Sequence, residues 1–158
     1  YLSHSGWRLL SDEMTVINLT TGFVEPFVRP ICLKNDSIDL FHSWFPDAFI
    51  SNVAKDTNKG DVAHVKAPTD SVNRYKEPAR VKAIVLPKYN KDIELDIYAL
   101  NKCDAYKSLS SNAFNEGVLG PSGFEAAVNL VESCDTVEIH YNDLNIVSEF
   151  LSEGQFKA

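Results

Sequence analysis

The chain has 158 residues, of which 44% are hydrophobic, and a formal net charge of -7. This length and composition predict a single globular domain over residues 1–158 with a sizeable core. The acidic balance argues against a nucleic-acid partner, which normally requires a basic face, and no apolar run reaches the ~20 residues of a membrane helix. Three widely spaced cysteines, Cys32, Cys103 and Cys134, are typical of reduced thiols, so we expect a cytoplasmic protein.

The first part of the chain is predicted to contain short strands. The apolar segment Trp7–Leu10 precedes two carboxylates, and a second segment, Met14–Leu19, follows them. A turn at residues 20–22 leads to Phe23–Val28, and another apolar segment occupies Ile31–Leu33. Strands joined by such short turns favour an antiparallel meander beside the acidic pair.

The middle of the chain is predicted to contain one helix and one strand. Asn35–Ser37 is a good N-cap signal, and the apolar spacing within Ile38–Phe45 suits one face of a helix. Residues 51–61 have few apolar groups and predict a mobile surface loop. Val62–Val65 is predicted to be a short strand, and residues 68–78 are expected to be irregular with at most one helical turn.

The remainder of the chain mixes strands and helices. Strands are predicted at Val81–Leu86, ended by Pro87, at Ile93–Tyr98 and at Val137–Tyr141. Helices are predicted at Lys102–Phe114, from Gly120 onward, and after Asn142–Asp143 up to Gly154. The sum is an α+β fold with a mixed or antiparallel sheet and C-terminal helices. The aromatic core candidates are Trp7, Trp44, Phe45 and Phe124.

The acidic pair Asp12–Glu13 has two interpretations. An exposed turn or helix N-cap would explain it. So would the end of a buried strand that delivers carboxylates to a phosphoryl-transfer site. There, one acid holds Mg²⁺ and the other accepts the proton of an attacking hydroxyl. Adjacent like charges raise each other's pKa unless a cation lies between them, which is why the second interpretation includes a metal.

Longer phrases around this pair are more informative. Residues 6–13, Gly-Trp-Arg-Leu-Leu-Ser-Asp-Glu, lead into a strand, and residues 29–38, Arg-Pro-Ile-Cys-Leu-Lys-Asn-Asp-Ser-Ile, follow it. Further characteristic phrases are Asn112–Asn115, Leu119–Gly120, Gly123–Ala126 and Tyr141–Leu144. From about Gly6 to Leu151, the chain resembles the HPr kinase/phosphorylase family, and in particular the HprK-related kinases.

The resemblance implies a P-loop kinase core of the PEP carboxykinase-like type, with ATP and Mg²⁺ as cofactors. Its substrate would be a serine or other hydroxyl on a small protein or peptide. Asp12 would activate that hydroxyl, and Asp12 and Glu13 would hold the metal. Arg29 and Lys34 are candidates for binding phosphate charge, although Lys34 is equally explained as a solvated lysine before a helix cap. Other members of the family carry a second aspartate where this chain has Glu13.

The largest departure from the family is an absence, because the chain contains no GxxxxGK[ST] phosphate-binding loop. Residues 1–5 look like the tail of a preceding helix, so we expect the chain to be the C-terminal portion of an HprK-like domain that binds ATP poorly alone. Two alternatives stay open: a non-catalytic binding module of a peptide-modification system, and a hydrolase of phosphorylated substrates. The family assembles into hexamers, so a homo-oligomer is also considered.

Overall fold

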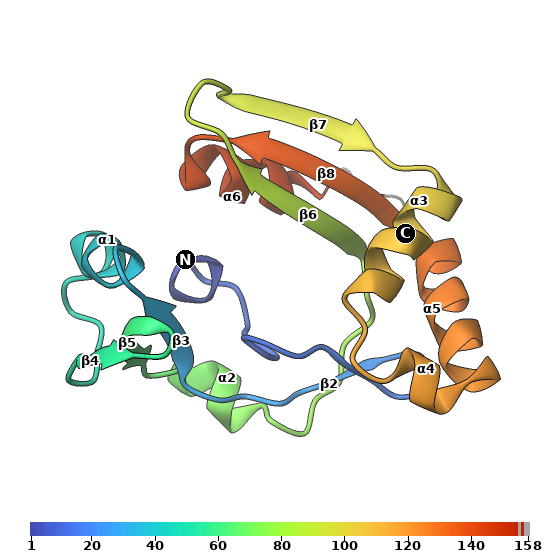
Figure 1. Ribbon diagram of the computed structural model, residues 1–158, viewed down its shortest axis with the longest axis horizontal. Helices are drawn as coiled ribbons and strands as arrows, with labels where there is room; N and C mark the ends of the chain where they lie inside the picture. The colour runs from blue at the N-terminus through green and yellow to red at the C-terminus, as the bar shows by residue number, and fades with distance from the viewer. Residues whose placement is uncertain (155, 157–158) are drawn as a thin grey trace. The chain divides into compact units, whose positions relative to one another are not determined.

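The structure, a computed structural model, describes residues 1–154 and 156 and has an α+β fold with antiparallel and mixed sheets. The chain divides into two compact units (Figure 1). The first unit consists of Tyr1–Val16 and Val24–Pro78, and the second of Ile17–Phe23 and Ala79–Ala158. Whether both units belong to one domain stays a prediction.

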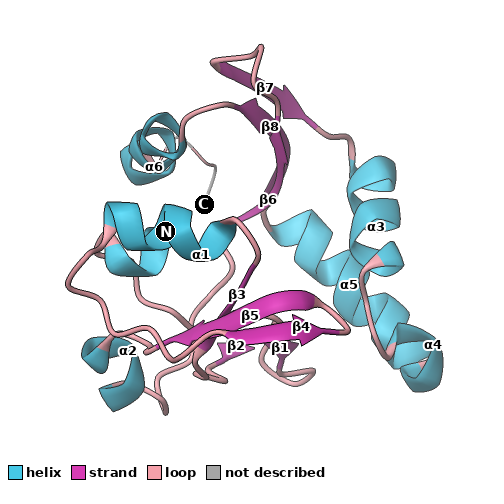
Figure 2. Ribbon diagram, turned by 60° about the vertical axis from the view of Figure 1, so that its left-hand side comes forward, coloured by secondary structure: helices cyan, strands magenta, loops and turns pink. Residues whose placement is uncertain are grey.

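The first unit is built on a three-stranded antiparallel sheet. Its strand order is β3-β5-β4, and the strands span Ile31–Lys34 (β3), Gly60–Val65 (β5) and Ala54–Thr57 (β4). Its helical elements are the 3₁₀ turn η1 (Leu2–His4), α1 (Ser37–Trp44) and α2 (Thr69–Asn73). Figure 2 shows the three strands side by side.

Apolar residues of β5 and α1 form the core of the first unit. Ala63 and Val65 are fully buried in the central strand, and Ile38 and Phe41 are buried on α1. The Phe41 ring also meets the ring of His4 edge-on, with a distance of 5.0 Å between the centroids. Burying this face of the helix is what stabilises a helix as short as α1.

The second unit is organised around one central strand. β8 (Asp135–Tyr141) lies between β6 (Ala83–Tyr89), which is parallel to it, and β7 (Leu95–Ala99), which is antiparallel. Its helices are α3 (Lys102–Ser111), α4 (Glu116–Leu119), α5 (Pro121–Ser133) and α6 (Leu144–Glu153). Val137 and Ile139 of β8 pack against Val147 of α6 on one face of the sheet (Figure 1).

A small hairpin connects the two units along the chain. Its strands are β1 (Val16–Ile17) and β2 (Val24–Glu25), which pair in a two-stranded sheet. The Asn18 side chain accepts hydrogen bonds from the backbone N–H groups of Thr20 and Thr21, which shapes the turn. The predicted strands Met14–Leu19 and Phe23–Val28 therefore exist as much shorter segments.

Several elements confirm the sequence-based expectations. Helix α1 begins at Ser37, within the N-cap signal Asn35–Ser37, and Ile31–Leu33 lies within β3. At the last helix, the Asp143 carboxylate accepts a hydrogen bond from the Asn145 backbone N–H at 2.8 Å. Helix α6 ends at Glu153, and the C-cap residue Gly154 has a φ of 63°, the left-handed conformation that glycine adopts without strain.

The predicted strand at Trp7–Leu10 is wrong, because this segment is an irregular extended stretch. The Leu9 N–H donates to the Ser71 side chain at 2.9 Å, and the Leu10 carbonyl accepts from the Phe27 N–H at 2.7 Å. The backbone groups therefore bind a side chain and a loop instead of a neighbouring strand. An apolar run alone does not distinguish these two cases.

The predicted mobile loop at residues 51–61 is also wrong. It contains β4 and a tight turn, in which the Thr57 hydroxyl donates to the Gly60 carbonyl at 2.6 Å. Gly60 has a φ of 80°, and a Cβ there would collide with the Asn35 side chain, which explains a glycine at this position. β4 is exposed along its whole length, so it lacks the apolar pattern by which strands are recognised.

Two further corrections concern Pro87 and the aromatic residues. Pro87 lies inside β6 and does not end it. β6 is an edge strand, and there the missing proline N–H costs no ladder hydrogen bond. Trp7, Trp44 and Phe124 were expected in the core, but their side chains are 41%, 38% and 50% exposed.

Candidate functional site

Asp12 lies in a bend that follows the irregular segment 7–10. One of its carboxylate oxygens, Oδ2, accepts a hydrogen bond from the backbone N–H of Cys32 at 3.0 Å. Nearby, the Ser11 hydroxyl accepts from the Met14 N–H at 3.2 Å, which shapes the bend. The hydrogen bond between Cys32 and Asp12 joins the two phrases 6–13 and 29–38, which lie apart in the sequence.

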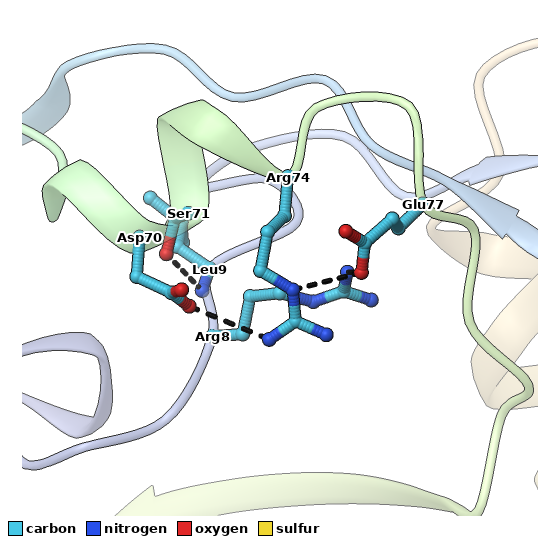
Figure 3. Close-up of polar contacts among 6 residues, drawn as sticks. All are labelled: Arg8, Leu9, Asp70, Ser71, Arg74 and Glu77. Carbon is cyan, nitrogen blue, oxygen red and sulfur yellow. Dashed lines mark hydrogen bonds and ion pairs between the residues drawn. The ribbon is translucent and has the colours of Figure 1, made fainter.

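A polar network holds the segment that leads to Asp12 (Figure 3). Ser71 of α2 is 1% exposed, and its hydroxyl accepts the hydrogen bond from Leu9 described above. The Arg8 guanidinium forms an ion pair of 3.4 Å with Glu77, just beyond α2. The backbone at residues 8 and 9 is therefore fixed to α2 and to the turn after it.

Arg74 completes this network. Its Nε donates to the Glu77 carboxylate at 2.8 Å, and its Nη1 lies 3.4 Å from the Asp70 carboxylate. Hydrogen bonds first to Glu77 and then to Asp70 raise the pKa of Arg74. Glu77 thus binds two guanidinium groups at once, those of Arg8 and Arg74.

The two candidate phosphate-binding residues lie at and just before β3. Lys34 is its last residue, and its backbone N–H donates to the Ser37 hydroxyl at 2.8 Å at the start of α1. Its side chain is exposed, which both interpretations of this lysine allow. The Arg29 guanidinium lies 5.5 Å from the centre of the Phe27 ring, a cation–π contact.

The structure brings some of these residues together but not others. Asp12 contacts β3 through Cys32, two residues before Lys34. Within residues 1–154 and 156, no hydrogen bond or ion pair is found between the acidic pair and Arg29 or Lys34. Whether these four residues form one site stays a prediction.

The acidic pair fits a magnesium ion by its chemistry. Mg²⁺ in kinases is bound through one or two carboxylates, with substrate phosphates and water as the other ligands. Asp12 and Glu13 are both exposed and offer such oxygens, and Asp12 uses Oδ2 for the Cys32 contact. Among the described residues, no group of three or more His, Cys, Asp or Glu side chains is arranged around a potential metal position.

A second polar cluster, on the sheet of the second unit, was not predicted. Glu138 of β8 binds both the His140 ring nitrogen Nε2, at 2.7 Å, and the Lys88 ammonium, at 2.8 Å. These contacts, with Lys88 as the larger cause, lower the pKa of Glu138. The Tyr98 ring lies edge-on to His140, and its hydroxyl donates to Asp96. Alternation in β8 places Glu138 and His140 on one face, which is the signal that could have revealed the cluster.

The described part of the chain has no helix with the length and apolar character needed to cross a bilayer. Comparison with protein-family models, with curated proteins and with solved structures finds no match. The sequence phrases and the geometry around Asp12 are therefore the grounds on which a function is assigned.

Proposed function

We propose that this chain is the C-terminal portion of a kinase related to HPr kinase/phosphorylase. It would transfer phosphate from ATP to a serine or other hydroxyl on a small protein or peptide. The observation that carries this proposal is the hydrogen bond from the Cys32 N–H to Asp12, because it joins the two phrases on which the resemblance depends. The three free cysteines, which are typical of a reducing compartment, support a cytoplasmic location.

In this proposal Asp12 is the general base. As the acceptor oxygen forms its bond to the γ-phosphorus, its proton passes to the Asp12 carboxylate and the bond to ADP breaks. The backbone N–H of Cys32 donates to Oδ2 of Asp12 and so orients the carboxylate. Its other oxygen can then accept the proton of the hydroxyl. Positioning of this kind supplies much of the catalysis in phosphoryl transfer.

The other proposed roles at the site concern the negative charge of the phosphate groups. Asp12 and Glu13 would hold Mg²⁺, which neutralises the charge that develops on the phosphates during transfer. Arg29 and Lys34 would contribute fixed positive charge toward phosphate oxygens. The network of Arg8 and Ser71 would support the acidic pair indirectly, because it fixes the backbone that leads to Asp12.

Replacement of the proposed base tests the proposal directly. Asp12→Asn keeps an oxygen that can accept the Cys32 N–H but removes the group that takes a proton. We expect phosphoryl transfer by the full-length protein to fall by about 10²–10⁴-fold, with ATP binding retained. Asp36→Asn, at an exposed aspartate without a side-chain capping bond, is the matched control and should leave transfer unchanged. Unchanged turnover in Asp12→Asn would remove this acid from the mechanism.

The role of Lys34 is tested by Lys34→Ala in the full-length protein. If its ammonium binds phosphate, nucleotide affinity should weaken by roughly 1–3 kcal/mol, the range of a charged hydrogen bond. Lys55→Ala removes another exposed lysine of the first unit and should have no effect. Equal affinities in the two variants would favour a solvated lysine.

A non-catalytic binding module of a peptide-modification system is the second candidate. The Asp12–Cys32 hydrogen bond favours it as well, because a carboxylate that fixes a backbone bend can have a purely structural role. The two candidates differ in their products. Phosphopeptide and ADP formed by the full-length protein would support the kinase, whereas peptide binding without turnover of ATP would support the module.

A further inference from the structure

The second unit contains an open groove of about 700 Å³. One wall is the hairpin turn at residues 17–23, another is the extended segment Arg80–Lys82 that leads into β6, and the third is α5. Its volume lies within the range of sites that bind ligands of substantial size. None of the residues proposed for phosphoryl transfer lines it.

The charge of the groove is opposite to that of the chain as a whole. Its lining includes Arg80 and Lys82 but no aspartate or glutamate, although acidic residues outnumber basic ones in the sequence by 22 to 15. Within the described residues, neither cation has an ion-pair partner, and both side chains are exposed. The Arg80 guanidinium lies 5.1 Å from the centre of the Phe23 ring, and this contact holds it against the turn.

One face of helix α5, with both polar and apolar side chains, lines the groove. Ala126, Asn129, Leu130 and Ser133 follow the spacing of three and four residues that places side chains on one helix face. The Asn129 side chain is exposed and has no hydrogen-bond partner among the described residues. A carboxamide both donates and accepts hydrogen bonds, which matches the N–H and C=O of a peptide bond.

We propose that this groove binds an extended acidic peptide segment of a partner protein. Arg80 and Lys82 would bind its carboxylates, since charge-assisted hydrogen bonds of this kind are the strong ones. Asn129 would bind its backbone, and Leu130 with Ala126 would contact an apolar side chain. A simple inorganic anion would use the two cations but neither the carboxamide nor the apolar stripe, which is why a peptide is the better match.

Fluorescence anisotropy on the full chain tests this proposal. The probe is a labelled peptide of about eight residues, ~26 Å when extended, that contains glutamate, aspartate and leucine. We expect saturable binding that weakens as salt is added, because exposed charges are screened. The double variant Arg80→Gln/Lys82→Gln should weaken binding by at least about tenfold. The charge-matched control Lys91→Gln/Lys107→Gln should bind as the unmodified chain does.

A third variant, Asn129→Asp, places a negative charge in the groove without changing the size of the side chain and should also weaken binding. All substituted side chains are exposed, so each variant should retain the circular dichroism spectrum of the unmodified chain. Three results would overturn the proposal: no binding of the acidic peptide, equal loss in the control variant, or equal binding of a lysine-containing peptide of the same length. Equal binding of a single-stranded oligonucleotide would overturn the assignment to a peptide.

Discussion

The central strand β8 of the second unit and the segment that leads to Asp12 in the first unit are held in place in different ways. In the second unit, β8 has ladder hydrogen bonds on both sides and carries the fully buried Ile139. In the first unit, the segment before Asp12 lies outside any sheet and is held by single contacts, the Leu9 N–H to Ser71 and Arg8 to Glu77. Leu9 and Ser71 are 62 residues apart in the sequence, and Arg8 and Glu77 are 69 residues apart.

This difference bears on where function is located. A strand inside a sheet shares its stability among many ladder bonds, whereas an irregular segment depends on a few specific groups. The acidic pair proposed to act in phosphoryl transfer follows such an irregular segment. We therefore expect single substitutions among the contacts of segment 7–10 to have local effects near Asp12, and substitutions in the core of β8 to affect the whole second unit.

The largest effect is expected from the core of the second unit. Ile139→Ala removes most of a side chain that is 0% exposed, so unfolding free energy should fall by about 2–5 kcal/mol, measured by urea denaturation. The control is Ile97→Ala, at the residue opposite on edge strand β7, which is 38% exposed. It should cost less than about 1 kcal/mol. Equal losses would contradict the view that β8 is the centre of this unit.

In the first unit, Ser71→Ala removes the acceptor of the Leu9 N–H. Loss of a partner at a buried site should cost about 1–3 kcal/mol of unfolding free energy. Hydrogen exchange gives the sharper measurement, because the Leu9 amide should exchange faster while the amides of β8 keep their protection. Ser43→Ala, which removes an exposed hydroxyl on α1, should change neither quantity. Faster exchange throughout β8 in Ser71→Ala would contradict the view that loss of this contact has only a local effect.

A side-chain contact also supports the second unit, at the end of α5. The Lys102 ammonium donates to the carbonyl groups of Val131, at 2.6 Å, and Cys134, at 3.2 Å. A cation at a helix C-terminus interacts favourably with the helix dipole, so Lys102→Met should cost about 0.5–2 kcal/mol in urea denaturation. Lys91→Met, at an exposed lysine in the loop before β7, is the control. A loss as large as that of Ile139→Ala would mean that single contacts matter as much in the second unit as they do for the segment before Asp12.

The smallest effect is expected from the Lys88–Glu138 ion pair. Because the pKa of Glu138 is lowered in the folded protein, first by Lys88 and then by His140, the ionised carboxylate stabilises the fold. This contribution is present above the ordinary value of about 4.5 and is lost as the pH falls through the lowered value. Lys88→Met should therefore reduce the acid sensitivity of the urea midpoint. An unchanged pH profile would contradict the assignment of the shift to this pair.

The elements that the sequence predicted well are those with a strong local signal. Helix α6 follows a capping aspartate and ends at a glycine, and the strand Val137–Tyr141 is an apolar alternating run within β8. Such signals require no knowledge of distant residues. The α+β class follows from them and is confirmed.

The errors occur where distant partners decide the structure. Trp7–Leu10 has the composition of a strand, but its hydrogen bonds go to Ser71 and Phe27. β4 is too polar to be recognised alone and exists because β5 lies beside it. At the candidate site, the residue types of Asp12 and Glu13 are visible in the sequence, but the Cys32 N–H that orients Asp12 is not. Neither is the pairing of Glu138 with Lys88 across two strands.

Pro87 has a consequence for the behaviour of the protein in concentrated solution. Exposed sheet edges are templates on which another polypeptide can add a strand, and aggregation begins in this way. β6 is such an edge, and the ring nitrogen at Pro87 has no hydrogen to offer an incoming chain. The same residue that the sheet tolerates at no cost thus interrupts the row of N–H groups that the β6 edge would otherwise offer to another chain.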